Sequence, residues 1–173
     1  MCAFPLHVWT IILAFRDFSW VTERSNAWDA IGLISYGMVF ALIESLVVFL
    51  AAILLGFLVS RHWDEGRRIA LLSVLVLITA LWAMASQLYF LWGISLPEQM
   101  MQFLAQLGHP ARVLYAATLA LVLPTVLVPT YLVLKSDRAF HTVRELTERL
   151  SLLTMFYMVL DAAGLVILLI RNL

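Results

Sequence analysis

The fold is decided by the stretch AIGLISYGMVFALIESLVVFLAAILLGFLVS, residues 30–60. It contains no Lys, Arg or His, and it carries one acidic residue, Glu44, near its middle. An α-helix of this length is roughly 46 Å long, whereas the hydrocarbon core of a bilayer is about 30 Å thick. The stretch therefore predicts a transmembrane helix that tilts or projects beyond the core.

The composition of the whole chain is that of an integral membrane protein. Hydrophobic residues make up 64% of the 173 positions and charged residues 13%, with a mean hydropathy of +0.98. Soluble domains are about half apolar and about one-quarter charged. Further apolar runs at 69–93, 111–134 and 151–170 predict three more spans, and residues 4–22 predict a short fifth span or an interfacial helix. We therefore predict an all-α, polytopic transmembrane helical bundle that forms one domain over residues 1–173.

Charge and cysteine content exclude several classes of function. The 11 basic and 11 acidic residues cancel, which argues against a nucleic-acid partner and leaves the lipid bilayer as the expected environment. The one cysteine, Cys2, cannot form an internal disulfide and has no partners at metal-ligand spacing. No pair of histidines lies at mid-span depth, where heme would need its ligands. The sequence thus predicts no metal site and no cofactor.

Basic residues are distributed unevenly between the two ends of the predicted spans. Seven of the eleven fall in the loops at 61–68 and 135–150, and Arg16, Arg24 and two others fall on the opposite side. Loops rich in Lys and Arg are generally cytoplasmic. We therefore expect both loops in the cytoplasm, the protein in an inner or plasma membrane, and the C-terminus outside.

Two connecting segments are amphipathic. The first, 95–108, opens with Ser95 and Glu98 in a capping-box pattern and predicts an interfacial helix on the outer side. The second, about 138–150, has one apolar side and two pairs of opposite charge four residues apart. We interpret the second segment either as a docking surface for a cytoplasmic partner or, more simply, as a solvated helix that leads into the last span.

Two acidic residues lie near the middle of predicted spans, where a charged side chain is costly unless it is paired, hydrated or protonated. Glu44 borders a stripe of small residues in 30–60, and Asp161 shares a face of 151–170 with hydroxyl groups and a glycine. We expect both at similar depth and pointing into the bundle, where they are candidates to face one another. Together the two acids predict either a proton or cation site or a structural polar centre. Four polar side chains are expected around it: Ser45, Thr154, Tyr157 and Gln87.

Two prolines, Pro124 and Pro129, lie inside the span at 111–134. Each removes a backbone N–H donor and frees a carbonyl group one turn earlier, so a kink or partial unwinding is expected. Freed carbonyl groups can line a cavity or bind a cation, although proline is also common in ordinary membrane helices. Beside two central acids, the expected kink favours a polar interior.

Charged residues at the outer membrane surface suggest an enzymatic alternative. Arg16, Asp17, His109 and Arg112 are candidates to surround a lipid phosphate, with His109 as acid or base. Their spacing matches no nucleophile, metal or phosphate-loop motif. The pattern therefore gives this alternative little support, and we expect no catalytic residues.

The sequence as a whole favours a small, non-enzymatic structural or accessory membrane subunit. Such a subunit would act with a membrane-protein partner or as a homo-oligomer. The first alternative is a proton- or cation-coupled small transporter or channel that uses Glu44 and Asp161, because intramembrane acids often mark ion pathways. The second alternative is a lipid-modifying enzyme at the membrane surface.

Overall fold

The computed structural model describes residues 1–59, 63–93 and 95–173, and within them the regular structure is helical. Four helices are long and apolar enough to cross a membrane, and a shorter apolar helix precedes them, which confirms the predicted fold class. Ser60 and Arg61, at the predicted end of the first long span, lie outside the described residues. The helices are α1 (Ala3–Arg16), α2 (Phe18–Arg24), α3 (Ala27–Leu58), α4 (Glu65–Leu91), α5 (Glu98–Gln106), α6 (Pro110–Lys135) and α7 (Asp137–Asn172).

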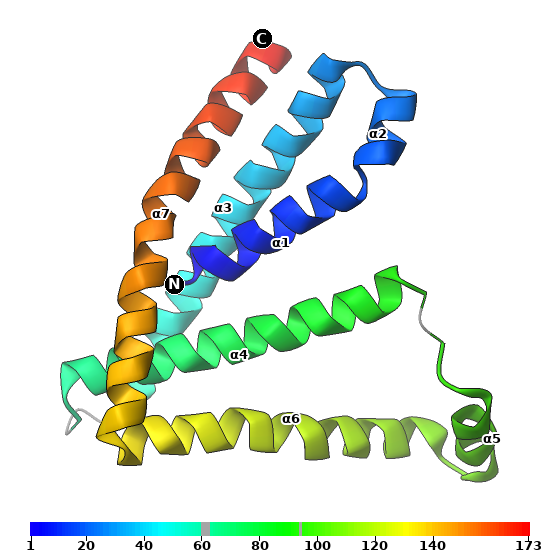
Figure 1. The fold of residues 1–173 in the computed structure, drawn as a ribbon, viewed down its shortest axis with the longest axis vertical. Helices are drawn as coiled ribbons and strands as arrows, with labels where there is room; N and C mark the ends of the chain where they lie inside the picture. The colour runs from blue at the N-terminus through cyan, green and yellow to red at the C-terminus, as the bar shows by residue number, and fades with distance from the viewer. Residues whose placement is uncertain (60–62, 94) are drawn as a thin grey trace.

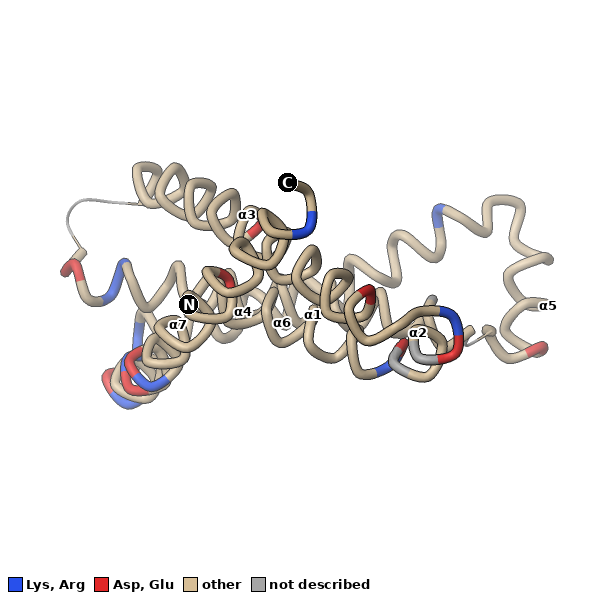
Figure 2. The backbone as a smooth tube through the Cα atoms, turned by 90° about the horizontal axis from the view of Figure 1, so that it is seen from above, with Lys and Arg blue, Asp and Glu red and all other residues tan. Residues whose placement is uncertain are grey.

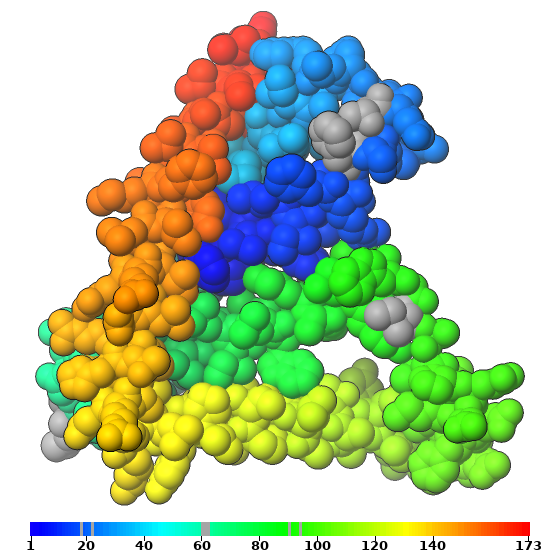
Figure 3. Space-filling model, in the orientation of Figure 1, coloured from blue at the N-terminus to red at the C-terminus, as the bar shows by residue number. Residues whose placement is uncertain are grey.

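The helices form two groups that share one end (Figure 1). α3 and α7 run antiparallel and side by side, and α1 lies along the first half of α3. α4 and α6 form an antiparallel hairpin that diverges from this group, with α5 at its far end (Figure 1). In the space-filling view, α1 lies between the α3–α7 pair and α4 (Figure 3). α1 thus contacts α3, α4 and α7.

The N-terminal apolar region is divided into two helices. α1 contains 14 residues and is about 21 Å long, which is shorter than the hydrocarbon core of a bilayer. It ends at Asp17, whose backbone leaves the helical region at φ −90° and ψ 6°, and α2 follows directly. The helix expected over 4–22 is therefore broken at Asp17. That α1 spans the membrane stays a prediction.

Side chains and prolines determine where two of the helices begin. Asn26 Oδ1 accepts a hydrogen bond from the backbone N–H of Asp29 at 2.8 Å and caps α3. The capping box expected at Ser95 is wrong, because α5 begins only at Glu98 and has no side-chain cap. The residue before a proline avoids helical geometry, so Pro97 delays the start of α5.

Small residues let the helices approach one another closely. A methyl group added at Gly37 of α3 would lie 3.1 Å from Thr10 Cγ2 of α1, and one added at Gly164 of α7 would lie 3.3 Å from the carbonyl oxygen of Ser35. Ala41, on the same stripe of α3 as Gly37, is 1% exposed. The predicted stripe of small residues therefore lies at a helix–helix interface, as is common in membrane proteins.

α7 continues without a break from its charged first part into its apolar part. In the charged part, Arg144 Nε donates to Glu148 Oε1 at 2.8 Å and Arg149 Nη2 donates to Glu145 Oε1 at 2.5 Å. Apart from Glu44 and Asp161, charged positions gather along this part and at or near the ends of the helices (Figure 2). The prediction that this segment leads directly into the last span is confirmed, and its use as a docking surface stays a prediction.

The two groups of helices meet in a small hydrophobic core. Ala70 and Val74 of α4 pack with Val133 of α6, and Phe140 of α7 lies against them. Beside this core, the Arg67 guanidinium lies 5.6 Å from the centre of the Phe140 ring and pairs with the carboxylate of the first residue of α7. This contact joins the α4–α6 hairpin to α7.

Candidate functional site

A buried polar contact joins α1 to α7. His7 of α1 is fully buried, and Asp161 of α7 is 3% exposed. His7 Nε2 lies 2.9 Å from Asp161 Oδ1 and 3.1 Å from Oδ2. His7 Nδ1 lies 2.8 Å from the backbone carbonyl oxygen of Ala3. Both ring nitrogens and the carboxyl group are therefore engaged.

The contacts of the His7 ring determine how many protons the pair holds. The Ala3 carbonyl group can only accept a hydrogen bond, so His7 Nδ1 carries a proton and donates it. The contact between Nε2 and Asp161 needs one further proton, on the nitrogen or on the carboxyl oxygen. The pair is thus an imidazolium with a carboxylate or an imidazole with a carboxylic acid, and its total charge is zero in both forms. A neutral pair avoids the high cost of burying an isolated ion.

Among the polar side chains expected around Asp161, Tyr157 contacts the pair directly. Its ring stacks on the His7 ring with centroids 4.7 Å apart and an interplanar angle of 19°. Thr154 Oγ1 is buried and has no hydrogen-bond partner within the described part of the chain. Ser45 is buried and donates to the carbonyl oxygen of its own helix at 2.6 Å. Of the four expected side chains, Tyr157 is therefore the one whose contact with the pair is established.

Glu44 lies apart from the His7–Asp161 pair. Gly164 of α7 packs against Ser35 of α3, and this contact sets the register of the two antiparallel helices. With a rise of 1.5 Å per residue, Glu44 then lies roughly 7 to 9 Å farther along α3 than the level of Asp161. Glu44 is exposed, and no hydrogen bond or ion pair to another described residue engages its carboxyl group. Among the described residues, the two acids do not form the shared polar centre expected from the sequence.

Glu44 lines a groove between α1, α3 and α4. The groove has a volume of about 590 Å³, within the range of about 300–1,000 Å³ that is typical of small-molecule sites. Its walls are mostly apolar and include the aromatic residues Trp9, Tyr36 and Phe40, while α4 supplies Gln87. No basic residue occurs among the described residues of its walls.

The two carboxyl groups of the groove lie toward opposite ends. Gly37 of α3 lies against Thr10 of α1, and the two helices run antiparallel (Figure 1). The start of α1 is therefore near the level of Glu44, and Asp17 is near the level of Ala30. Arg16 Nε lies 3.7 Å from Asp17 Oδ1, and Arg16 Nη2 donates to the carbonyl oxygen of Leu91 at 3.4 Å. Asp17 therefore has a basic neighbour, and Glu44 has none among the described lining residues.

α6 is helical through both of its prolines. The partial unwinding expected at Pro124 and Pro129 is absent from this fully described helix, and a kink there stays a prediction. Thr125 Oγ1 donates to a carbonyl oxygen of its own helix and accepts from Trp82 Nε1 of α4, each at 2.8 Å. The described walls of the groove include no residue of α6. The prolines are thus placed away from Glu44.

The candidates for an enzymatic site at the outer surface are separated. Arg16 and Asp17 lie at the end of α1, whereas His109 and Arg112 lie at the start of α6. Over the described ranges, α1 makes no contact with α5 or α6. The lipid-phosphate site considered from the sequence is therefore not assembled by these four residues.

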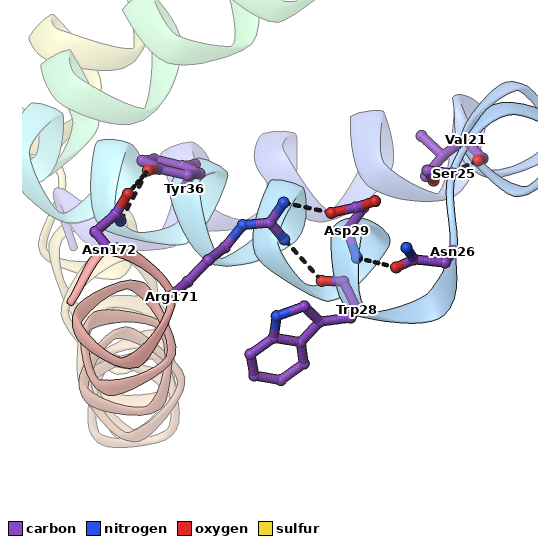
Figure 4. Close-up of polar contacts among 8 residues, drawn as sticks. All are labelled: Val21, Ser25, Asn26, Trp28, Asp29, Tyr36, Arg171 and Asn172. Carbon is purple, nitrogen blue, oxygen red and sulfur yellow. Dashed lines mark hydrogen bonds and ion pairs between the residues drawn. The ribbon is translucent and has the colours of Figure 1, made fainter.

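A polar cluster joins the start of α3 to the end of α7 (Figure 4). Arg171 pairs with the carboxylate of Asp29, and its Nη1 donates to the carbonyl oxygen of Trp28 at 2.9 Å. Asn172 Nδ2 donates to Tyr36 Oη at 3.0 Å. Charged and aromatic side chains of this kind are typical of the boundary between membrane and water. The cluster holds the end of α7 beside the start of α3.

His7 was not among the candidate site residues that the sequence suggested. The available signal was a histidine on an apolar helix, because an ionisable side chain in such a helix usually has a buried partner. Its position three residues before Thr10, on the side of α1 that also packs, was a second signal.

Comparison of the chain with known protein families, with curated proteins and with solved structures finds no match. Within the described ranges, no group of three or more His, Cys, Asp or Glu side chains is placed to hold a metal ion. Functional interpretation therefore depends on the geometry of the groove and of the buried pair.

Proposed function

We propose that the protein is a small membrane carrier that binds a cation at Glu44. The observation that supports this is the unpaired Glu44 carboxyl group in the groove, halfway along a helix of spanning length. A carboxyl group at that depth is costly unless a counter-charge, a proton or water reaches it, and intramembrane acids commonly mark ion or substrate pathways. A cation that enters the groove supplies the partner that the described part of the chain does not place there.

The His7–Asp161 pair has a different role in this proposal. Its charge is already balanced, and it holds α1, which is one wall of the groove, against α7. Asp161 is then a positioning residue, which modifies the sequence-based alternative in which both acids bind the cation. The sequence alone favours an accessory subunit. That role gives no reason for an unpaired acid in a groove of the size of a small molecule.

Proteoliposomes that contain the full chain test the proposal. Influx is measured for protons with a luminal pH dye, for Na⁺ and K⁺ with fluorescent indicators, and for ethidium by its fluorescence with enclosed DNA. We expect at least one of these cations to enter faster than into empty liposomes, and Glu44→Gln to remove the difference. Glu98→Gln, the same change on α5 outside the groove, is the matched control and should retain the flux.

Thermal unfolding in detergent shows whether the Glu44→Gln protein is folded. Similar stability is expected, because the Glu44 carboxyl group has no hydrogen bond to another described residue. If the folded wild-type protein carries none of the four cations, or if E44Q leaves the flux unchanged, the proposal is wrong. The accessory-subunit interpretation would then be preferred.

A further inference from the structure

We infer that the ligand of the groove is an amphiphilic organic cation with aromatic or alkyl groups. The inference rests on the proposed cation site at Glu44 and names the class of ligand that this site takes. Two features that lie together carry it: one carboxyl group without a basic neighbour among the described lining residues, and aromatic walls within a volume of about 590 Å³. Ligand charge, ligand surface and ligand size each follow from these features.

The polar groups of the groove are too few for an inorganic cation. Ions such as Na⁺ and Ca²⁺ are held by about six or more oxygen ligands. Besides the two acids, the described polar side chains of the walls are Thr10, Tyr36 and Gln87. The Thr10 hydroxyl donates to a carbonyl oxygen of its own helix at 3.0 Å, and Tyr36 is engaged with the end of α7. Glu44 with mainly apolar neighbours cannot replace the hydration shell of such an ion.

The aromatic residues of the groove favour an organic cation instead. Trp9 of α1 and Tyr36 and Phe40 of α3 line the same groove as Glu44. An aromatic face attracts a cation within about 6 Å of the ring centre, and quaternary ammonium groups are recognised in this way. The apolar groups of such a cation also gain free energy when they leave water. One carboxyl group and several rings therefore suffice to bind it.

The size and the position of the groove favour a small molecule that arrives from the membrane. A transmembrane helix of another protein has about 20 residues and would need a contact surface as long as the bilayer core, whereas a volume of about 590 Å³ matches a small-molecule site. In the orientation expected from the distribution of basic residues, Asp17 lies toward the outer end of the groove and Glu44 toward the inner end. A cation from the outer interface would pass Asp17 before it reaches Glu44.

Binding of radiolabelled tetraphenylphosphonium to the full chain in detergent, measured by equilibrium dialysis, tests the inference. We expect saturable binding that Glu44→Gln weakens at least about tenfold, because the change removes the one carboxyl group of the described lining that has no basic neighbour. Glu44→Asp should retain most of it. Trp9→Leu and Phe40→Leu should each weaken binding roughly 2- to 30-fold. Glu98→Gln and Trp92→Leu change an acid and an aromatic residue outside the groove and should leave binding unchanged.

A neutral compound and an inorganic ion separate this inference from the proposed function. Triphenylmethanol, which is similar in shape and uncharged, should not displace tetraphenylphosphonium, and neither should Na⁺. The protein could show a Glu44-dependent flux of protons, Na⁺ or K⁺ but no Glu44-dependent binding of tetraphenylphosphonium. That result would overturn the inference and leave the proposed function standing. If folded protein shows neither cation flux nor tetraphenylphosphonium binding, the inference and the proposed function are both wrong. Thermal unfolding of every variant ensures that only folded protein is compared.

Discussion

His7 and Asp161 are 154 positions apart in the chain, and their side chains meet at 2.9 Å in the interior of the bundle. The contact joins the first helix to the last, and both of these helices pack against α3. The pair therefore ties α1, and with it one wall of the groove, to α7, in addition to the packing of α1 against α3 and α4.

Replacement of Asp161 should destabilise the bundle through the loss of this pair. We expect Asp161→Leu to lower the free energy of unfolding by about 1–3 kcal/mol, because a buried His7 nitrogen loses its partner. Asp161→Asn should cost less, because the amide can still form a hydrogen bond with Nε2. Thermal unfolding in detergent measures both variants. Equal losses in the two variants would show that Asp161 contributes by packing alone.

A larger side chain at Gly164 should separate α3 from α7. A methyl group there would already lie 3.3 Å from the Ser35 carbonyl oxygen, so Gly164→Leu forces the two backbones apart. We expect a loss of about 1–3 kcal/mol in the free energy of unfolding, as is typical of overpacking. Ala163→Leu, on an exposed position of the same helix, is the control and should be nearly neutral. Similar losses from both variants would contradict the close approach at Gly164.

The ion pair between Arg171 and Asp29 should contribute modestly to stability. Its side chains are 29% and 43% exposed, and pairs of this kind typically contribute about 0.2–1 kcal/mol. A double-mutant cycle with Arg171→Gln and Asp29→Asn measures the coupling, which should decrease as salt is raised from low to molar concentration. Coupling that is unaffected by salt would mean that the contact is not mainly electrostatic.

The thiol of Cys2 should react slowly while α1 is packed. Burial raises the pKa of this thiol, and the thiolate is the form that reacts with iodoacetamide. Alkylation at pH 7 should therefore be slow, should accelerate as the pH rises, and should be faster after unfolding in sodium dodecyl sulfate. Because Cys2 is the sole cysteine, labelling reports this site alone. Asp161→Leu should also accelerate alkylation, because it loosens α1. Equal alkylation rates in folded and unfolded protein would show that Cys2 is not protected by the packing of α1.

The long helices could be predicted from the sequence, together with the charged segment that leads into the last one, but hydropathy alone does not locate the starts of α4 and α7. α4 begins at Glu65 and α7 at Asp137, whereas the apolar runs begin at 69 and 151. Hydropathy identifies the part of a helix that can lie in the lipid bilayer. Both helices extend beyond that part into charged residues, which are equally compatible with helical geometry. The break at Asp17 also escaped prediction, because no proline or glycine marks it.

The candidate site was predicted in its components and not in their arrangement. Glu44 and Asp161 were recognised because an acid in an apolar run is exceptional. Their separation depends on the register between α3 and α7, which Gly164 and Ser35 determine by contact. The pairing of Asp161 with His7 depends on where a short helix docks, and no local pattern in either segment specifies that.

The uninterrupted course of α7 has a mechanical consequence. The helix contains no proline, and its one glycine is packed against α3, so nothing along it acts as a joint. It is one continuous helix whose charged first part extends beyond the apolar part that holds α1. A rotation imposed near Arg144 is transmitted to Asp161, 17 residues and roughly 26 Å away. A force applied to the charged part of α7 would therefore act on Asp161 and, through His7, on the α1 wall of the groove.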